Sequence, residues 1–294
     1  MRDKNPLISI VLCTYNGERF LKEQMDSLLG QTYTNLEVII VDDHSQDGTP
    51  EILRKYAGAH PNIRLFFNEH NIGFNANFEK GLRLAQGEYI AISDQDDIWR
   101  PDKIAFLLNC IGDGLLVYSD SILIDRDGNP VGRNNLHRKR LYVGGDPRAF
   151  ILVNNVSGHS VLLKRTLLDI AFPLPPHCVY DWWLGLVATN EKKIRATKEA
   201  LTYYRQHNNN TSVVLWNKRL QLLFLRDWTK DILTLEGLQH RSFFEKLHVL
   251  IRQHTRHYWD LRLLFFLVAH WKILTCNTDR KALSRLNIVR KICI

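Results

Sequence analysis

The chain has 294 residues, of which 45% are hydrophobic and 24% charged, and these values exclude a disordered, collagen-like or disulfide-stapled chain. The length predicts one large domain or two small ones, and five cysteines without a Cys-x-x-Cys pair favour a reducing cytoplasm. The net charge of +8 is uneven, because residues 216–294 hold 15 Lys and Arg against 6 Asp and Glu. Such a basic region could bind nucleic acid or an anionic membrane face, or could be solvated surface.

The first third of the chain alternates strand and helix patterns. Continuous apolar, β-branched runs are typical of buried parallel strands, and we interpret the N-terminal run as a core strand instead of a signal peptide. We predict strands at 7–12, 36–41, 63–67 and 88–93, and helices at 17–30, from Thr49 onward, and at 75–85. This β-α-β-α-β-α-β order predicts an α/β fold with an open, mostly parallel central sheet flanked by helices.

Acidic side chains follow two of the predicted strands. The second strand runs into Asp42 and Asp43, and the fourth runs into a segment with Asp94, Asp96 and Asp97. Ligands of such sheets bind at the carboxyl ends of the strands, so both segments are expected to converge on one cleft. Clustered carboxylates repel one another unless a hard cation or a donor-rich ligand lies between them. A divalent ion that carries a diphosphate satisfies both requirements.

Several other functional motifs are absent. The sequence contains no GxxxxGK[ST] phosphate loop, no GxGxxG after the first strand, no HExxH and no GxSxG. His254 and His257 lie three positions apart on a predicted helix, but no carboxylate spacing supports a metal site there, and we expect both at the surface. The acidic residues that follow the predicted strands are therefore the strongest indication of a functional site.

At this point the chain resembles the family 2 glycosyltransferases, which have the GT-A fold. The motifs that carry the resemblance are Ser9–Asn16, Ser27–Thr32, Val41–Thr49, Asn71–Gly73 and Ser93–Trp99. The last of them is most similar to the bacterial rhamnosyltransferase-like branch. The resemblance implies a GT-A-type, Rossmann-like catalytic domain at 1–215, with a nucleotide-sugar-binding half at 1–110 and an acceptor-side half at 111–215. Residues 216–294 then form a basic helical C-terminal extension.

The resemblance assigns donor-binding roles. Thr14 and Tyr15 would line the base pocket, with the Tyr ring available for stacking, and Asp43 would accept a hydrogen bond from a pyrimidine imide. Asp42 would brace the same loop, and Asp94 would lie near the ribose or the metal. The residues expected to bind the nucleotide sugar are Thr14, Tyr15, Asn16, Asp43, Asn71, Asp94 and Arg205.

The resemblance also implies a divalent cofactor, Mn²⁺ or Mg²⁺. Asp96, the last acid of the Asp-x-Asp unit, is the first choice for direct coordination, and Asp97 is left open as a further ligand. His207 lies in a segment, 203–210, that resembles the part of the family that closes over the donor, and it would contact the metal or the diphosphate. The metal would neutralise the charge that builds on the leaving diphosphate.

The catalytic base is expected at Asp181. The segment from Tyr180 opens an apolar helix, which places Asp181 at its cap or in its first turn, and a purely structural N-cap is the alternative. The family places its base here, usually as Glu-Asp, whereas this chain has Tyr180 in place of the Glu. One base opposite one leaving group implies inversion. Trp182 and Trp183 could supply a sugar-stacking face or fill the core.

Two further segments, 154–160 and 261–274, can be given a predicted role. Residues 154–160 precede a strand predicted at 161–164 and are expected to line the acceptor cleft. Residues 261–274 form the most apolar stretch of the extension, which is too short to span a bilayer. An interfacial helix and a buried packing helix both fit this stretch.

The sequence therefore predicts an inverting, metal-dependent glycosyltransferase. It would move a rhamnose-, glucose- or galactose-type sugar from a dTDP- or UDP-sugar to a glycan, lipid-linked acceptor in bacterial O-antigen or capsule synthesis. We expect a cytoplasmic protein, peripheral on the inner face of the cytoplasmic membrane through its basic region, with no nucleic acid partner. The alternatives are a nucleotidyltransferase on the same fold and a basic nucleic-acid-binding protein.

Overall fold

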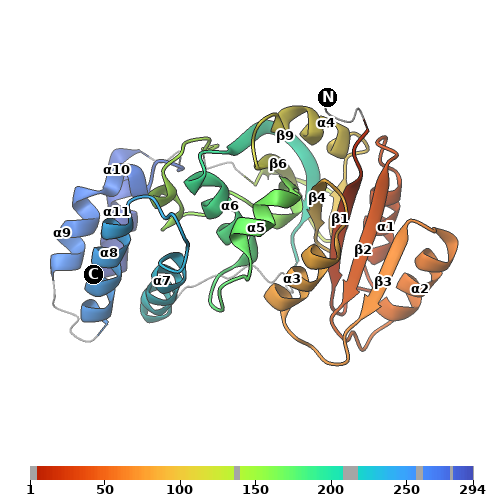
Figure 1. Ribbon diagram of the computed structural model, residues 1–294, viewed down its shortest axis with the longest axis horizontal. Helices are drawn as coiled ribbons and strands as arrows, with labels where there is room; N and C mark the ends of the chain where they lie inside the picture. Colours follow the sequence, from red (N-terminus) through yellow and green to blue (C-terminus); the bar gives the residue numbers. More distant parts are fainter. Residues whose placement is uncertain (1–4, 136–139, 208–217, 256–260, 279–280, 294) are drawn as a thin grey trace.

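The computed structural model describes residues 5–135, 140–207, 218–255, 261–278 and 281–293. In these ranges one sheet of nine strands runs in the order β3-β2-β1-β4-β8-β6-β9-β5, with β7 paired to β6 (Figure 1). The strands are β1 (Ile8–Thr14), β2 (Leu36–Asp42), β3 (Ile63–Phe67), β4 (Tyr89–Ser93), β5 (Ile98–Trp99), β6 (Leu116–Ile124), β7 (Pro130–Asn134), β8 (Val161–Lys164) and β9 (Ile194–Arg205).

Helices cover both faces of this sheet. In residues 1–215 they are α1 (Leu21–Leu29), α2 (Thr49–Ala59), α3 (Phe74–Leu84), α4 (Lys103–Ile111), α5 (Leu168–Ala171) and α6 (Tyr180–Asn190). In the extension they are α7 (Lys218–Ile232), α8 (Arg241–His254), α9 (Leu261–Ala269), α10 (Trp271–Leu274) and α11 (Ala282–Cys293). The extension lies at the end of the molecule opposite β3 and α2 (Figure 1).

The first four strands follow directly from their apolar runs. β1 is buried along its whole length, and its alternate side chains enter two different hydrophobic clusters. Ile8, Ile10 and Leu12 pack with residues of α1, α2 and α4, whereas Val11 and Cys13 pack with residues of α3. A strand that is covered on both faces needs apolar residues at every position, and this is the pattern from which it was predicted.

The predicted elements of this half are confirmed. The four predicted strands match β1 to β4 to within two residues at each end, and β1, β2, β3 and β4 pair in parallel. The helix predicted from Thr49 begins there, and the helix predicted at 75–85 is α3. The carboxyl ends of β1, β2 and β4 therefore meet at one edge of the sheet.

The second half of the sheet is mixed. β8 was predicted from its apolar run, and it pairs antiparallel to both β4 and β6. β6 and β9 pair in parallel although many residues separate them in the chain, and β5 pairs antiparallel to β9. Strands β5, β6 and β9 were not predicted from the sequence, because β9 carries charged residues along an exposed stretch and its partner is distant in the chain.

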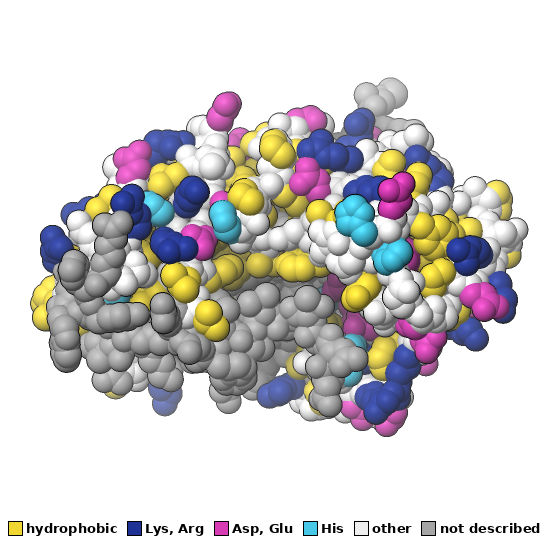
Figure 2. Space-filling model, turned by 90° about the horizontal axis from the view of Figure 1, so that it is seen from below, with side chains coloured by type: hydrophobic (Ala, Val, Ile, Leu, Met, Phe, Trp, Pro, Cys, Tyr) yellow, Lys and Arg dark blue, Asp and Glu magenta, His cyan; other side chains and the backbone are white. Residues whose placement is uncertain are grey.

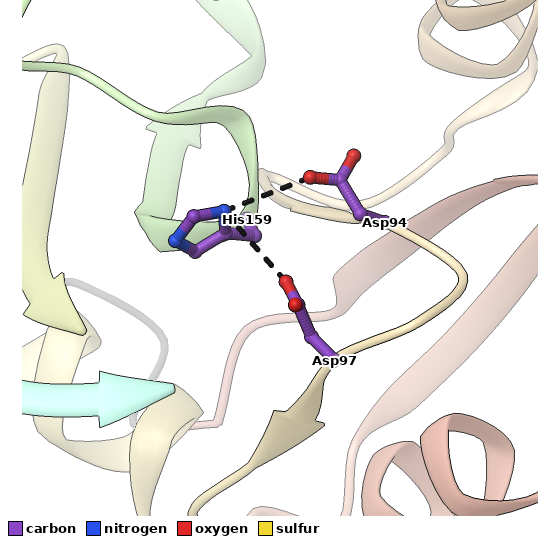
Figure 3. Close-up of side chains that lie close together, drawn as sticks. All are labelled: Asp94, Asp97 and His159. Carbon is purple, nitrogen blue, oxygen red and sulfur yellow. Dashed lines mark ion pairs between the residues drawn. The ribbon is translucent and has the colours of Figure 1, made fainter. Parts of the chain in front are cut away.

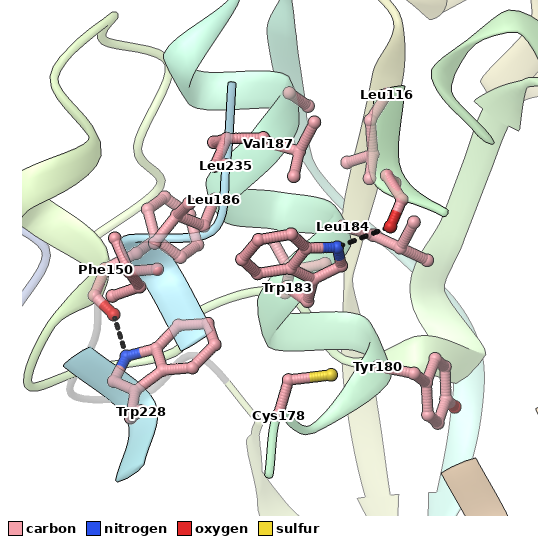
Figure 4. Packing of buried hydrophobic residues seen from close by; sticks show 14 of the residues in the cluster. Leu116, Phe150, Cys178, Tyr180, Trp183, Leu184, Leu186, Val187, Trp228 and Leu235 are labelled. Carbon is pink, nitrogen blue, oxygen red and sulfur yellow. Dashed lines mark hydrogen bonds between the residues drawn. The ribbon is translucent and has the colours of Figure 1, made fainter. Parts of the chain in front are cut away.

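The extension is helical, as predicted, and it packs against residues of the segment 111–215. Trp228 of α7 is fully buried in one cluster with Phe150 and Trp183 (Figure 4). Asn277, after α10, is also buried, and its side-chain amide donates to the carbonyl oxygens of Ala149 and Val153 at 3.0 and 2.9 Å. Polar and apolar contacts therefore both hold the described part of the extension to the preceding part of the chain.

One expectation about the extension was wrong. His254, expected at the surface, is 1% exposed, because the last turn of α8 packs into the cluster that contains Ile251. Its predicted neighbour His257 lies outside the described residues.

The apolar stretch 261–274 forms α9 and α10. Leu263 and Leu267 of α9 are buried, whereas Leu261, Phe265 and Val268 are exposed, and Phe265 is 68% exposed. The stretch is thus a packing helix on one side and presents an apolar stripe on the other. Among the described residues, no helix has both the length and the apolar character needed to cross a membrane.

Candidate active site

A cleft of about 1340 Å³ opens where β1, β2 and β4 end. Its other side is formed by the loop before β8 and by the first turn of α6. Of the ten residues assigned to the site from the sequence, nine line this cleft: Thr14, Tyr15, Asn16, Asp43, Asn71, Asp94, Asp96, Asp181 and His207. The tenth, Arg205, lies elsewhere.

The end of β1 is tied to the loop that follows β2. The Thr14 hydroxyl donates to Asp42 Oδ1 at 2.8 Å, and the backbone N–H and hydroxyl of Ser45 donate to the same carboxylate at 2.8 and 2.7 Å. Asp42 is fully buried, so it braces this loop as expected. Asn16, with φ 49°, accepts the backbone N–H of Gln46 at 2.8 Å. The two loops therefore form one connected wall of the cleft.

Asp43 holds the next loop along this wall. Its Oδ1 accepts from the Asn68 amide and from the backbone N–H of Ile72, both at 2.8 Å, and its Oδ2 accepts from the backbone N–H of Gly73 at 2.9 Å. Asn71 Oδ1 accepts the same Gly73 N–H at 3.0 Å. A carboxylate offers about four lone-pair sites, so three donors leave Asp43 able to accept one more hydrogen bond from a ligand.

Gln95 is a structural residue that was not singled out from the sequence. Its side-chain amide exchanges two hydrogen bonds with the backbone of Tyr15, at 2.8 and 3.0 Å. A Cβ atom at Gly17 would approach Gln95 Oε1 to 2.3 Å, so glycine is required for this close contact. Gln95 therefore fixes the acidic loop to the end of β1 and leaves the Tyr15 ring 48% exposed beside the cleft. The middle position of an Asp-x-Asp unit carries no signal for such a contact.

The two residues predicted as metal ligands lie in direct contact. His207 Nε2 is 2.7 Å from Asp96 Oδ2, and each side chain is 15% exposed. The His207 ring also packs against Phe20, with 5.1 Å between ring centroids. A carboxylate oxygen beside an imidazole nitrogen is a donor set that suits Mn²⁺, and the carboxylate alone suits Mg²⁺. The rest of the predicted closing segment, 208–210, lies outside the described residues.

A second cluster lies next to this pair. One ligand atom from each of Asp94, Asp97 and His159 falls within 4.8 Å of the other two, and His159 Nδ1 is 3.6 and 3.7 Å from the two carboxylates (Figure 3). The His159 ring is buried, stacks on Tyr204 at 4.4 Å, and its Nε2 lies 2.8 Å from the Ser121 hydroxyl. The segment 154–160 was expected to line the cleft, but nothing in its spacing linked His159 to the acidic loop.

Asp97 is the fully buried member of the acidic loop. Burial raises the pKa of its carboxyl well above the usual value, and the charges of Asp96 and Asp94 raise it further, while the Arg205 backbone N–H and Lys103 oppose this. Its Oδ1 accepts that N–H at 3.0 Å, and its Oδ2 has no hydrogen-bond donor within the described residues. A cation near this loop would favour the ionised form of Asp97.

The structure places Arg205 beneath the acidic loop and not in the cleft. The residue is 1% exposed. Its guanidinium donates to the carbonyl oxygens of Asp96 and Arg126, both at 2.9 Å, and forms an ion pair with Glu23. The predicted contact between Arg205 and the nucleotide has no counterpart in this arrangement, in which the side chain holds the loop in position.

Asp181 lies in the first turn of α6. The N-cap of this helix is Val179, so Asp181 is not the capping residue. Its Oδ1 accepts from the Asn154 amide at 3.2 Å, and its Oδ2 accepts from the backbone N–H of Gly158 at 3.0 Å. These contacts fix the carboxylate on the side of the cleft opposite β1 and β2, with the segment 154–160 beside it as expected.

The turn before Asp181 is held by α3. The Tyr180 backbone N–H donates to Asn75 Oδ1 at 3.1 Å, and the Asn75 amide donates to the carbonyl oxygen of Cys178. The Tyr180 ring stacks on Phe78 with 4.1 Å between centroids, and burial raises the pKa of its hydroxyl. Tyr180, which stands where the resemblance would place a Glu, is thus a packing residue that positions its neighbour.

Comparison with known proteins identifies a family whose model matches this chain. The model of the family described as Glycosyl transferase family 2 matches residues 9–170. The chain is also similar to a putative teichuronic acid biosynthesis glycosyltransferase of Bacillus subtilis, TuaG. The two are 33% identical over 135 residues, which cover 45% of this chain and 54% of TuaG.

Two solved structures resemble this fold. TarS 1–349 from S. aureus, in complex with UDP-GlcNAc, is 18% identical with a TM-score of 0.60, and the match covers 91% of this chain and 81% of that one. The mannosyltransferase PcManGT from Pyrobaculum calidifontis, in complex with GDP-Man and Mn²⁺, is 18% identical with a TM-score of 0.56, and the match covers 97% and 79%. The predicted GT-A-type fold class is confirmed.

Proposed function

Because this chain belongs to glycosyl transferase family 2, we propose that it is an inverting, metal-dependent hexosyltransferase of bacterial surface polysaccharide synthesis. It takes a rhamnose-, glucose- or galactose-type sugar from a dTDP- or UDP-sugar and transfers it to a glycan, lipid-linked acceptor of the O-antigen or capsule type. The observation that carries the proposal is the cleft itself, which has Asp96 and His207 on one side and Asp181 on the other.

The donor is proposed to bind against β1, β2 and β4. Asp43 retains capacity for one more hydrogen bond, which the imide N3–H of uracil or thymine can supply, whereas N3 of cytosine carries no hydrogen. The exposed Tyr15 ring offers a face on which the base stacks. That similar folds hold UDP-GlcNAc and GDP-Man supports a nucleotide-sugar donor.

The diphosphate is proposed to lie at the acidic loop. Asp96 and His207 would hold a divalent ion, Mn²⁺ or Mg²⁺, and when bound it neutralises the charge on the leaving diphosphate. Asp94, Asp97 and His159 offer a second donor set, in which Asp97 and His159 are buried. The Mn²⁺ in PcManGT supports metal dependence.

Asp181 is proposed to take the proton of the acceptor hydroxyl. Its carboxylate is oriented by Asn154 and Gly158, so the bond is formed with little reorganisation of the base. The acceptor hydroxyl then attacks from the side opposite the diphosphate, and the configuration at the anomeric carbon is inverted.

The exposed stripe of α9 is proposed to contact the cytoplasmic face of the membrane. Leu261, Phe265 and Val268 recur at helical spacing, and exposed Arg262 and Lys272 lie beside them in the sequence. Lys and Arg side chains are visible over this end of the molecule, as they are over the opposite end (Figure 2). Sedimentation with vesicles that contain anionic lipid tests the contact, and Phe265→Asp should reduce the bound fraction severalfold. Equal sedimentation of both proteins would refute it.

One panel of substrates tests the reaction. The chain is incubated with dTDP-, UDP- and GDP-sugars, with and without Mn²⁺ and a lipid-linked glycan, and the released nucleotide is measured. Release of dTDP or UDP that requires both metal and acceptor supports the proposal. The nucleotidyltransferase alternative consumes a nucleoside triphosphate and a sugar 1-phosphate instead, so release of pyrophosphate in a parallel incubation with dTTP or UTP and a sugar 1-phosphate would replace the proposal by that activity.

A further inference from the structure

Two aromatic rings border the cleft beside Asp181. Trp182 of α6 and Phe224 of α7 both line the cleft, with 5.5 Å between their ring centroids and 37° between their planes. Both side chains are half-buried, so part of each ring is open to the cleft. Phe224 is contributed by the C-terminal extension, whereas the other residues of the cleft precede it in the chain.

The polar atom of the Trp182 ring is already used. Its indole N–H donates to the carbonyl oxygen of Phe150, which also accepts the indole N–H of Trp228 at 3.3 Å (Figure 4). The Trp228 ring packs against Trp182 at 5.5 Å and is fully buried. Trp182 is therefore fixed in orientation and offers the cleft an apolar surface instead of a hydrogen-bond donor.

Trp182 and Phe224 lie at the edge of the core, against its buried residues. Trp183 and Trp228, at 2% and 0% exposed, fill the space between α6 and α7 and contact each other edge to face at 6.2 Å. Trp182 and Phe224 add apolar area on the rim of that core, inside a cleft whose opposite wall is polar and acidic. Aromatic faces beside a few fixed polar groups are typical of a ligand site.

The position of Phe224 is set by contacts that two later residues of α7 make. Trp228, one turn later, is buried in the core, and Asp231 accepts the backbone N–H of His177 at 2.9 Å while its other oxygen lies 3.2 Å from His177 Nδ1. His177 belongs to the loop that leads into α6, which carries Asp181 and Trp182. These contacts join α7 of the extension directly to the loop that precedes α6.

We propose that Trp182 and Phe224 form the stacking platform of the acceptor subsite, and that the acceptor residue that reacts is a pyranose ring and not a linear polyol phosphate. The proposal rests on the proposed function, because it takes Asp181 as the base. The C–H groups on one face of a pyranose are weakly positive, and they complement the negative faces of aromatic rings. Asp181 lines the same cleft as this platform, so its carboxylate is available to a hydroxyl of a sugar bound there. A polyol phosphate has no such ring face to stack.

Binding of simple glycosides to the full chain tests this platform without requiring turnover. Methyl α-L-rhamnopyranoside, methyl β-D-glucopyranoside and ribitol 5-phosphate are titrated by ligand-observed NMR against the parent, Trp182→Leu, Phe224→Leu and Phe224→Tyr. We expect at least one glycoside to bind the parent more tightly than ribitol 5-phosphate. Its affinity should fall about 3- to 10-fold in the two Leu variants, the scale of a lost aromatic contact, and should be retained in Phe224→Tyr. Phe106→Leu, which alters a half-buried ring of α4 outside the cleft, is the matched control and should bind normally.

The outcomes separate this proposal from the proposed function. Affinity for UDP and dTDP is measured on the same samples and should be unchanged in all four variants, because the platform lies across the cleft from the donor loops. A parent that binds neither nucleotide would refute the proposed function, while the platform is judged by the glycoside affinities alone. Tighter binding of ribitol 5-phosphate, no glycoside binding to the parent, or equal glycoside affinity in the parent and both Leu variants would overturn the platform.

Discussion

The two sides of the cleft are built in different ways. On the proposed donor side, the loops after β1, β2 and β4 are joined by side-chain hydrogen bonds to backbone groups, such as those of Asp43 to the turn that contains Gly73. On the proposed acceptor side, helices from distant parts of the chain meet through aromatic packing, as Trp182 and Trp228 do. Hydrogen bonds from polar side chains thus fix the proposed donor side, whereas aromatic packing between distant helices fixes the proposed acceptor side.

The largest loss of transfer activity is expected from substitution of Asp96, in the acidic loop. Asp96→Ala and Asp96→Asn should each reduce transfer by at least about 10³-fold, because a neutral group replaces a charged ligand for a hard cation. Mn²⁺ affinity, measured by electron paramagnetic resonance, should fall in parallel, whereas Asp97→Asn should affect it less if Asp96 and His207 are the ligands. Asp113→Asn, an exposed aspartate paired with Arg195, is the control. Full activity in EDTA, or in Asp96→Ala, would refute the metal role.

Substitution of Asp181 should reduce turnover and leave the affinity for the nucleotide unchanged. Asp181→Asn should lower kcat by roughly 10²–10⁴-fold, the usual contribution of a positioned general base. The amide still accepts one of the two hydrogen bonds from Asn154 and Gly158, so the fold is expected to persist. Nucleotide affinity, measured by calorimetry, should not change. Turnover within about threefold of the parent would instead indicate a structural role.

A change in the donor wall should weaken nucleotide binding. Asp43→Asn places an amide where Ile72 and Gly73 present N–H groups, so it should cost about 1–3 kcal/mol in UDP or dTDP affinity, the scale of a lost buried hydrogen bond. Glycoside binding at the acceptor platform should be unaffected. Asp26→Asn, on α1 outside the cleft, serves as the control. Unchanged nucleotide affinity would move the base-reading role to another residue.

The smallest expected effect is a change in the free energy of unfolding, and it comes from Glu37. Glu37 of β2 is buried, which raises its pKa, but hydrogen bonds from Ser9, the Gln86 backbone N–H and Arg64 outweigh this and lower the pKa below 4.5. The stabilisation is therefore present in full above pH 4.5 and is lost as the pH falls through the lower folded-state pKa.

Substitution of Glu37 by Gln isolates this contribution. Glu37→Gln should reduce the free energy of unfolding by about 1 kcal/mol at neutral pH and should flatten its dependence on pH below 4.5. Urea unfolding on both sides of that pH measures both quantities. Glu51→Gln, at an exposed position of α2, should change stability little. A pH profile of Glu37→Gln that matches the parent would contradict the expectation.

Local patterns in the sequence were enough to specify the donor half. A buried strand needs apolar residues on both faces, and a helix needs them at every third or fourth position, so β1 to β4 and α1 to α3 could be predicted from these patterns. Parallel strands bring their carboxyl ends to one edge, which is why Asp43, Asp94 and Asp96 could be assigned to one cleft from the order of the strands alone. The apolar helix pattern predicted Asp181 at the cap or in the first turn of a helix, and it lies in the first turn of α6, whereas its role as the base was taken from the family resemblance.

The rest of the cleft depends on how distant parts of the chain pack together. Arg205 is buried beneath the acidic loop, His159 lies against Asp94 and Asp97, and Phe224 joins Trp182 across the boundary of the extension. Each of these contacts joins residues tens of positions apart, and it depends on how β6, β9 and α7 pack. A local pattern reports which face of an element is apolar, but the partner of that face is set by the packing of the whole chain.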